Sequence, residues 1–164
     1  MVMIMVMIMM MNIASIKYDS LVNGEGLRTV VFAQGCKHNC KGCFNPHTHE
    51  FGVGRDYEVE DLYKIIKENC LMKKVTFSGG DPLYQVEGFT ELAKLLKADG
   101  YNIWCYTGFT IEEIQNDDNM SKILDYVDVI VDGKFDESKA GEYKYKGSSN
   151  QRIIINIKEN IGNE

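Results

Sequence analysis

The sequence lacks an excess of positive charge. Its 164 residues include 18 Lys and Arg against 24 Asp and Glu, which gives a formal net charge of −6. Proteins that bind DNA or RNA depend mainly on clustered Lys and Arg, because these side chains neutralise phosphates and release counterions. The composition therefore argues against direct binding of a nucleic acid.

The sequence also lacks a hydrophobic run long enough to cross a membrane. Its Met/Val/Ile-rich segment covers only residues 1–11, whereas a transmembrane helix needs about 20 residues. The segment has neither the basic region nor the small-residue cleavage site of a signal peptide. We expect residues 1–11 to be a non-structural N-terminal extension rather than a membrane anchor, and residues 12–164 to form a single domain.

A framework of paired disulfides is missing as well. The chain has five cysteines, an odd number, and three of them lie close together in Cys36-Lys-His-Asn-Cys40-Lys-Gly-Cys43. Secreted scaffolds use even numbers of spaced cysteines, whereas clustered thiols are typical of metal chemistry in a reducing compartment. We therefore expect a cytoplasmic protein.

Short β-branched and aromatic runs alternate along the chain with segments of helical periodicity. The expected strands are 29–33, 74–78, 101–106 and 127–131, with a further apolar run at 153–155, and the expected helices are 58–70, 89–96 and a segment that Thr110 caps. Such alternation implies parallel strands joined by right-handed crossovers. The chain is too short for a closed eight-stranded barrel, which typically needs about 250 residues. We predict an α/β fold, an open partial (β/α) barrel.

The cysteine spacing is C-x3-C-x2-C. Thiolates are soft ligands that favour iron–sulfur clusters and zinc, and three cysteines can ligate three corners of a four-iron cluster. A structural zinc site would need a fourth ligand. The candidates for that ligand are His38, His47, His49, Cys70 and Cys105. Cys70 and Cys105 are expected to be buried as small hydrophobic residues, but the histidines leave zinc open.

A second motif, Gly79-Gly80-Asp81-Pro82, ends the expected strand 74–78. Glycine lets the backbone approach a ligand closely, because no Cβ intervenes. An ordinary turn at the end of a strand is the alternative explanation. Asp81 could position an ammonium group of a ligand or cap the following helix.

In the order and spacing of these two motifs, the chain resembles the radical S-adenosylmethionine enzymes. The resemblance implies that Cys36, Cys40 and Cys43 hold a [4Fe-4S] cluster whose fourth iron binds S-adenosylmethionine. Reductive cleavage of that cofactor would yield a 5′-deoxyadenosyl radical. The residues implied to bind the cofactor are Gly42, Cys43, Phe44, Gly79 and Gly80. Gly42 and Asp81 depart from the superfamily, in which an aromatic residue and Glu are common at these positions.

Further motifs narrow the resemblance to the activating proteins of anaerobic (class III) ribonucleoside-triphosphate reductases. They are Val22-Asn-Gly-Glu-Gly26-Leu-Arg28, Cys43-Phe-Asn45, Ser78-Gly-Gly-Asp-Pro-Leu83, Tyr106-Thr-Gly108, Val131-Asp-Gly-Lys-Phe135 and Gly147-Ser-Ser-Asn-Gln-Arg152. The similarity covers residues 12–157. It implies that the chain generates a glycyl radical on the reductase, with a flavodoxin- or ferredoxin-like protein as electron donor.

Hydrogen-atom abstraction needs neither a general base nor a nucleophile, because the cofactor supplies the chemistry. We therefore expect no catalytic side chain of the usual kinds. Lys37, His38 and Lys41 could compensate the charge of an anionic cluster or help an acidic electron donor to dock, or could be solvated loop charges. Two other functions stay open: activation of another glycyl-radical enzyme such as pyruvate formate-lyase, and a non-enzymatic zinc or iron–sulfur module.

Overall fold

The structure is a computed structural model that describes residues 8–43, 45–155 and 157. The strands are β1 (Met10–Ser20), β2 (Arg28–Ala33), β3 (Arg55–Glu58), β4 (Lys74–Gly79), β5 (Asn102–Tyr106), β6 (Val129–Asp132) and β7 (Arg152–Ile155). The α-helices are α1 (Val59–Asn69), α2 (Val86–Ala98) and α3 (Ile111–Gln115). Short 3₁₀ helices are η1 (Pro46–Thr48), η2 (Pro82–Gln85), η3 (Met120–Asp125) and η4 (Glu137–Lys139).

The strands form one seven-stranded sheet in the order β3-β1-β2-β4-β5-β6-β7. β2, β4, β5 and β6 are parallel, and the outer strands β1, β3 and β7 are antiparallel to their neighbours. The two edges of the sheet, β3 and β7, do not pair with each other, so the barrel is open. The predicted α/β fold with an open partial barrel is confirmed.

The outer strands differ from the sequence-based prediction. β1 and β3 were not predicted, and the apolar run at 153–155 forms β7, which pairs antiparallel with β6 rather than in parallel. β1 is hard to detect because its exposed and buried positions alternate irregularly. It also begins at Met10, and the side chain of Met11 is only 1% exposed. The last two residues of the expected N-terminal extension therefore belong to the sheet, and residues 1–7 lie outside the described part.

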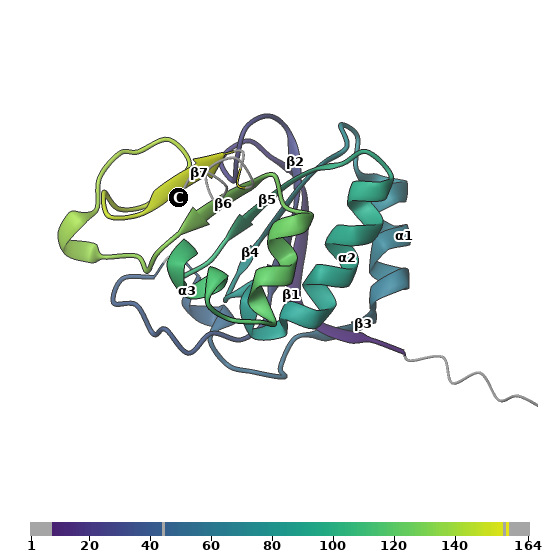
Figure 1. Ribbon diagram of the computed structural model, residues 1–164, viewed down its shortest axis with the longest axis horizontal. Helices are drawn as coiled ribbons and strands as arrows, with labels where there is room; N and C mark the ends of the chain where they lie inside the picture. The colour runs from purple at the N-terminus through teal and green to yellow at the C-terminus, as the bar shows by residue number, and fades with distance from the viewer. Residues whose placement is uncertain (1–7, 44, 156, 158–164) are drawn as a thin grey trace, which may run out of the picture.

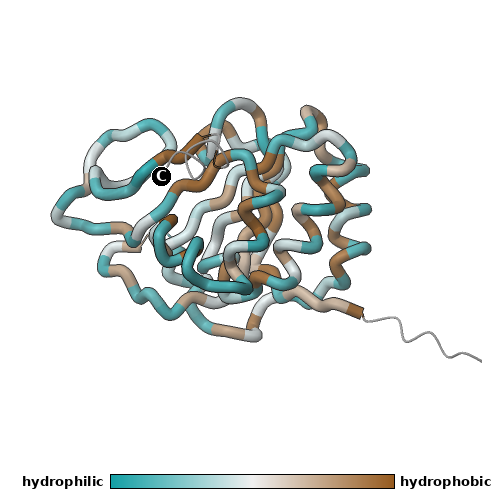
Figure 2. Tube along the Cα trace, in the orientation of Figure 1, coloured by the Kyte–Doolittle hydropathy of each residue, from teal (hydrophilic) through white to brown (hydrophobic). Residues whose placement is uncertain are grey.

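Helices α1 and α2 lie side by side across one face of the sheet (Figure 1). In α1 the buried residues Val59, Leu62 and Ile66 follow helical spacing, and Glu60 and Asp61 occupy the first turn, where the helix dipole favours negative charge. The buried faces of α1 and α2 pack against hydrophobic strands at the centre of the sheet (Figure 2). The core of the domain therefore lies between the helices and the sheet.

The opposite face of the sheet carries a smaller apolar cluster. Trp104, Val129 and Val131 pack there with Tyr145 and Ile153. The segment that joins β6 to β7 supplies Tyr145 and so covers part of this face. Within the part of the chain that the structure describes, no helix is long and apolar enough to span a bilayer.

Candidate functional site

The cysteine loop, residues 36–43, follows β2 at the end of the sheet that the carboxyl ends of the parallel strands form. Backbone hydrogen bonds fix its entry: the N–H of Gly35 donates to Thr48 O at 2.6 Å, and the N–H of Asp81 donates to Gly35 O at 2.9 Å. Ligands of open α/β sheets bind at this carboxyl end, because the loops that follow neighbouring strands converge there. The predicted position of the cysteines after a strand is confirmed.

The Gly-Gly pair is required by close backbone packing. Gly79 has φ of +115°, and a Cβ on it would lie 2.4 Å from the backbone N of Ala33. A Cβ on Gly80 would lie 2.4 Å from Gly35 O. The space that a side chain would fill is therefore occupied by the chain that enters the cysteine loop. Binding of a cofactor by Gly79 and Gly80 stays a prediction.

The three clustered thiols are free and partly exposed. Burial raises the pKa of Cys36 to about 11, although backbone hydrogen bonds from His38 and Asn39 oppose that shift. Burial also raises the pKa of Cys40, against a backbone hydrogen bond from Phe135. The backbone N–H of Asn45 lies 3.5 Å from Cys43 Sγ.

These thiols fit an iron–sulfur cluster by their donor chemistry. Hydrogen bonds from backbone N–H groups to the sulfurs are a common means of tuning such clusters. A bound iron would also stabilise the thiolate form that burial disfavours. Among residues 8–43, 45–155 and 157, no three His, Cys, Asp or Glu side chains converge on a point that could hold one metal ion. A cluster does not require such convergence, since each thiolate binds a different iron.

The fourth-ligand candidates lie in different environments. His38 Nε2 contacts Asp81 Oδ2 at 2.7 Å. Cys105 is fully buried in the core, as predicted, whereas Cys70 is only partly buried at the end of α1. His47 is exposed, and the buried Nε2 of His49 has no hydrogen-bond partner. Phe44, a predicted cofactor-binding residue, lies outside the described residues.

Asp81 joins the Gly-Gly motif to the loop after β5. Its side chain is 1% exposed and accepts a hydrogen bond from the N–H of Leu83, so it caps η2. Its carboxylate also accepts from Thr107 Oγ1 and from the N–H of Gly108. The predicted capping role is confirmed, but the link to His38 was not predicted, because a contact across 43 positions leaves no periodic signal in a sequence.

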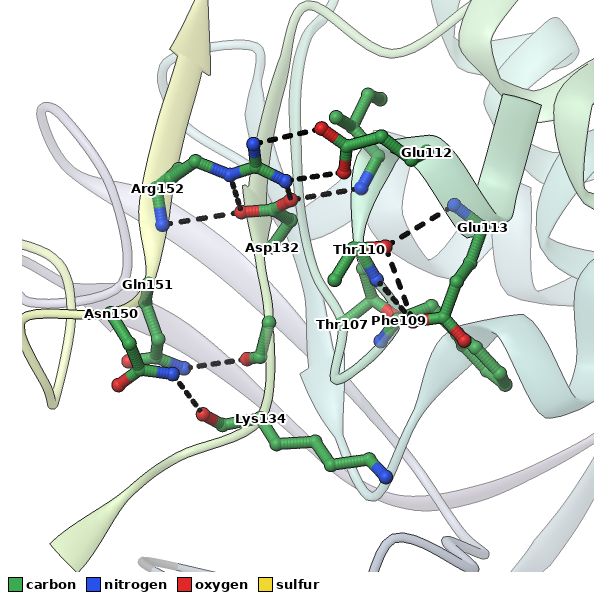
Figure 3. Close-up of polar contacts among 12 residues, drawn as sticks. Thr107, Phe109, Thr110, Glu112, Glu113, Asp132, Lys134, Asn150, Gln151 and Arg152 are labelled. Carbon is green, nitrogen blue, oxygen red and sulfur yellow. Dashed lines mark hydrogen bonds and ion pairs between the residues drawn. The ribbon is translucent and has the colours of Figure 1, made fainter. Parts of the chain in front are cut away.

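A second network of hydrogen bonds and ion pairs joins the end of β6 to the start of β7 (Figure 3). Arg152 binds Glu112 and the buried Asp132, with Nη2 at 2.6 Å and 2.5 Å from their carboxylate oxygens. The side-chain hydrogen bond from Arg152 lowers the pKa of Glu112 to about 2. Gln151 Nε2 donates to Gly133 O, and Asn150 Nδ2 donates to Lys134 O. The 147–152 motif therefore shapes the turn before β7.

A pocket of about 480 Å³ lies on the face of the sheet that α1 and α2 leave uncovered. Phe32, Ser78 and Tyr106 line it, and these strand residues face away from the core beneath the helices. Asn45, two positions after Cys43, also lines it. Its volume lies in the usual range for small-molecule sites, about 300–1,000 Å³.

Comparisons with known proteins agree with this geometry. The family model described as a 4Fe-4S single cluster domain matches residues 22–154. The crystal structure of QueE from Escherichia coli shares the fold, with a TM-score of 0.55 at 18% identity over 76% of this chain and 70% of that one.

Relatives from several bacteria and from one phage carry the name anaerobic ribonucleoside-triphosphate reductase-activating protein. The relative from Vibrio cholerae is 37% identical over 81% of this chain and 90% of its own length. The relative from Enterobacteria phage T4 is 34% identical over 89% of this chain and 95% of its own length.

A cysteine loop after β2, within the residues that the cluster-domain model matches, defines an iron–sulfur protein with a single 4Fe-4S cluster domain. The chain belongs to the family of anaerobic ribonucleoside-triphosphate reductase-activating proteins.

Proposed function

We propose that this chain activates an anaerobic ribonucleoside-triphosphate reductase by generating a glycyl radical on it. The free thiols of the cysteine loop carry the proposal, together with a pocket of about 480 Å³ that Asn45 lines just after that loop and the relatives' shared name. Bound together, a [4Fe-4S] cluster and S-adenosylmethionine supply a one-electron reduction that breaks a carbon–sulfur bond.

The residues of this chain hold and shelter the reacting groups. Cys36, Cys40 and Cys43 are the proposed ligands of the cluster. Gly42, Cys43, Phe44, Gly79 and Gly80 are the proposed residues around S-adenosylmethionine. No side chain has to move a proton, because the proposed reaction transfers a hydrogen atom from a glycine of the partner protein.

An external electron donor is part of the proposal, and a flavodoxin- or ferredoxin-like protein fits it. Lys37 is exposed, and the side chain of Lys41 is 93% exposed, so both can meet an acidic surface near the cysteine loop. We place the chain in the cytoplasm, where thiols stay reduced.

The test begins with anaerobic reconstitution with iron and sulfide. We expect an electron paramagnetic resonance signal of a reduced [4Fe-4S] cluster that changes when S-adenosylmethionine is added, together with formation of 5′-deoxyadenosine. A colourless protein with one tightly bound zinc would contradict the proposal.

The partner is identified by mixing the reconstituted chain, S-adenosylmethionine and a reductant with each candidate enzyme. The anaerobic reductase should acquire a glycyl-radical signal, and pyruvate formate-lyase should not. Single changes to Ala at Cys36, Cys40 or Cys43 should abolish the signal. The matched controls Cys70→Ala and Cys105→Ala should retain it, because these thiols lie outside the cysteine loop.

A further inference from the structure

We infer that His38 is a positioning residue, which fixes the cluster-binding conformation of the cysteine loop by anchoring that loop to Asp81. The inference rests on the proposed cluster but not on the identity of the protein partner. It assigns a role to the histidine between the first two cysteines and to the acidic residue of the Gly-Gly motif.

Asp81 is a rigid anchor whose oxygens are already engaged. Leu83 N–H donates to Oδ1 at 2.9 Å, Thr107 Oγ1 lies 2.9 Å from Oδ2, and Gly108 N–H donates to Oδ2 at 2.8 Å. With His38 added, these donors account for the roughly four lone-pair sites of a carboxylate. Asp81 is thus satisfied by the chain itself, which favours anchoring over the binding of a ligand's ammonium group.

The imidazole of His38 lies in a slot formed by Asp81, Tyr84, Gly108 and Phe109. Its side chain is 6% exposed, and Nε2 lies 2.7 Å from Asp81 Oδ2, so Nε2 carries the donated proton. The ring packs edge-on against Phe109 at 4.7 Å and tilted against Tyr84 at 5.3 Å between centroids. A Cβ on Gly108 would lie 2.5 Å from His38 Cδ2, so the slot needs glycine at that position.

Anchoring His38 also fixes the first ligands of the proposed cluster. His38 stands two positions after Cys36 and two before Cys40. The backbone groups of His38 and Asn39 favour the thiolate of Cys36, since they lower the pKa that burial raises. The anchored side chain restrains the backbone at His38, between the first two cysteines, and hydrogen bonds to cluster sulfurs help to set the reduction potential. Since Nε2 is occupied by Asp81, His38 acts through the loop rather than as a ligand.

The test compares two substitutions that separate the hydrogen bond from the ring. His38→Phe keeps an aromatic ring in the slot but has no donor for Asp81, whereas His38→Gln places an amide N–H near the position of Nε2. Lys94→Gln is the control, since it changes an exposed side chain of α2 outside the cysteine loop. Each full-length chain is reconstituted anaerobically, and its folding is verified by circular dichroism.

Two properties of the reconstituted proteins are measured: the rate at which a chelator removes iron, and the midpoint potential of the cluster. Loss of a partner that orients metal ligands typically costs 10–100-fold in affinity, so H38F should lose iron about tenfold faster than the wild type. The midpoint potential of H38F should shift, while H38Q and K94Q should stay close to the wild type in both properties.

The outcomes separate this inference from the proposed function. A wild-type chain that binds no cluster would overturn both. A cluster in the wild type with unchanged iron retention and potential in H38F would overturn the inference alone, and so would an H38Q variant as impaired as H38F. If H38F does not fold, His38→Asn, whose shorter amide cannot reach Asp81, replaces it under the same criteria.

Discussion

Arg28 begins β2 at the end opposite the cysteine loop, and its side chain is only 1% exposed. The guanidinium makes five hydrogen bonds: to Thr76 Oγ1, Glu25 O, Val75 O, and both the backbone and side-chain oxygens of Asn102. It also stacks on Trp104, with Cζ 5.4 Å from the ring centroid. Arg28→Met keeps an unbranched stem but removes every donor.

The expected loss of stability follows from these contacts. A hydrogen bond contributes about 1 kcal/mol net, so the five total about 5 kcal/mol. Burial opposes the charged form and lowers the pKa of Arg28 to about 10, and a methionine avoids that cost. We therefore expect Arg28→Met to lower the free energy of unfolding by about 2–4 kcal/mol, a large part of the 5–15 kcal/mol typical of a domain.

The assay is urea unfolding followed by far-ultraviolet circular dichroism, with wild type and variants in the same state of cluster loading. Arg28→Lys is the control for charge, and it should recover only part of the loss, because an ammonium has three donors and no planar fork. Iron binding by the folded Arg28→Met variant should be retained, since Arg28 lies at the other end of the strand. A loss below about 1 kcal/mol would refute the account, because it would not exceed that of one hydrogen bond.

Three more predictions concern the core, the Gly-Gly motif and the strand-end network. Cys105→Ala should lower stability by about 1 kcal/mol through a small cavity and leave the iron content unchanged, as measured by unfolding and iron analysis. Gly79→Ala should reduce both stability and iron binding, since its Cβ would press on the backbone of Ala33; unchanged iron content would contradict this. Glu112→Gln should cost about 0.5 kcal/mol at neutral pH, as for an exposed ion pair. Because the folded pKa of Glu112 is lowered from 4.5 to about 2, this difference in stability should shrink as pH falls across that interval.

The parallel centre of the fold could be predicted from local patterns. Strands β2, β4, β5 and β6 are short apolar runs, and α1 follows strict helical spacing, so each carries its own signal. β1 and β3 were not predicted, because their burial depends on pairing with each other and with β2, and no local periodicity in the sequence encodes that pairing. β7 was visible as an apolar run, but its direction depends on the long turn that precedes it.

The candidate site was predictable only in part, for the same reason. The cysteine spacing and the Gly-Gly pair are local motifs, and the structure places both at one edge of the sheet. The contacts of Asp81 with His38 and of Arg152 with Asp132 join residues 43 and 20 positions apart. The first pair arises from the crossover between β2 and β4, and the second from the long connection between the antiparallel strands β6 and β7. In a sequence, their residues resemble ordinary polar residues of loops.

The structure also changes what the Gly-Gly motif contributes to the cysteines. Because Gly79 and Gly80 have no side chains, the backbone that leaves β2 packs directly against the backbone at the end of β4. Asp81 then follows directly and holds His38. The two motifs therefore form one interface, in which β4 sets where the cysteine loop begins and how it turns. A substitution in the glycine motif should consequently be detected at the cluster even if no cofactor atom touches either glycine.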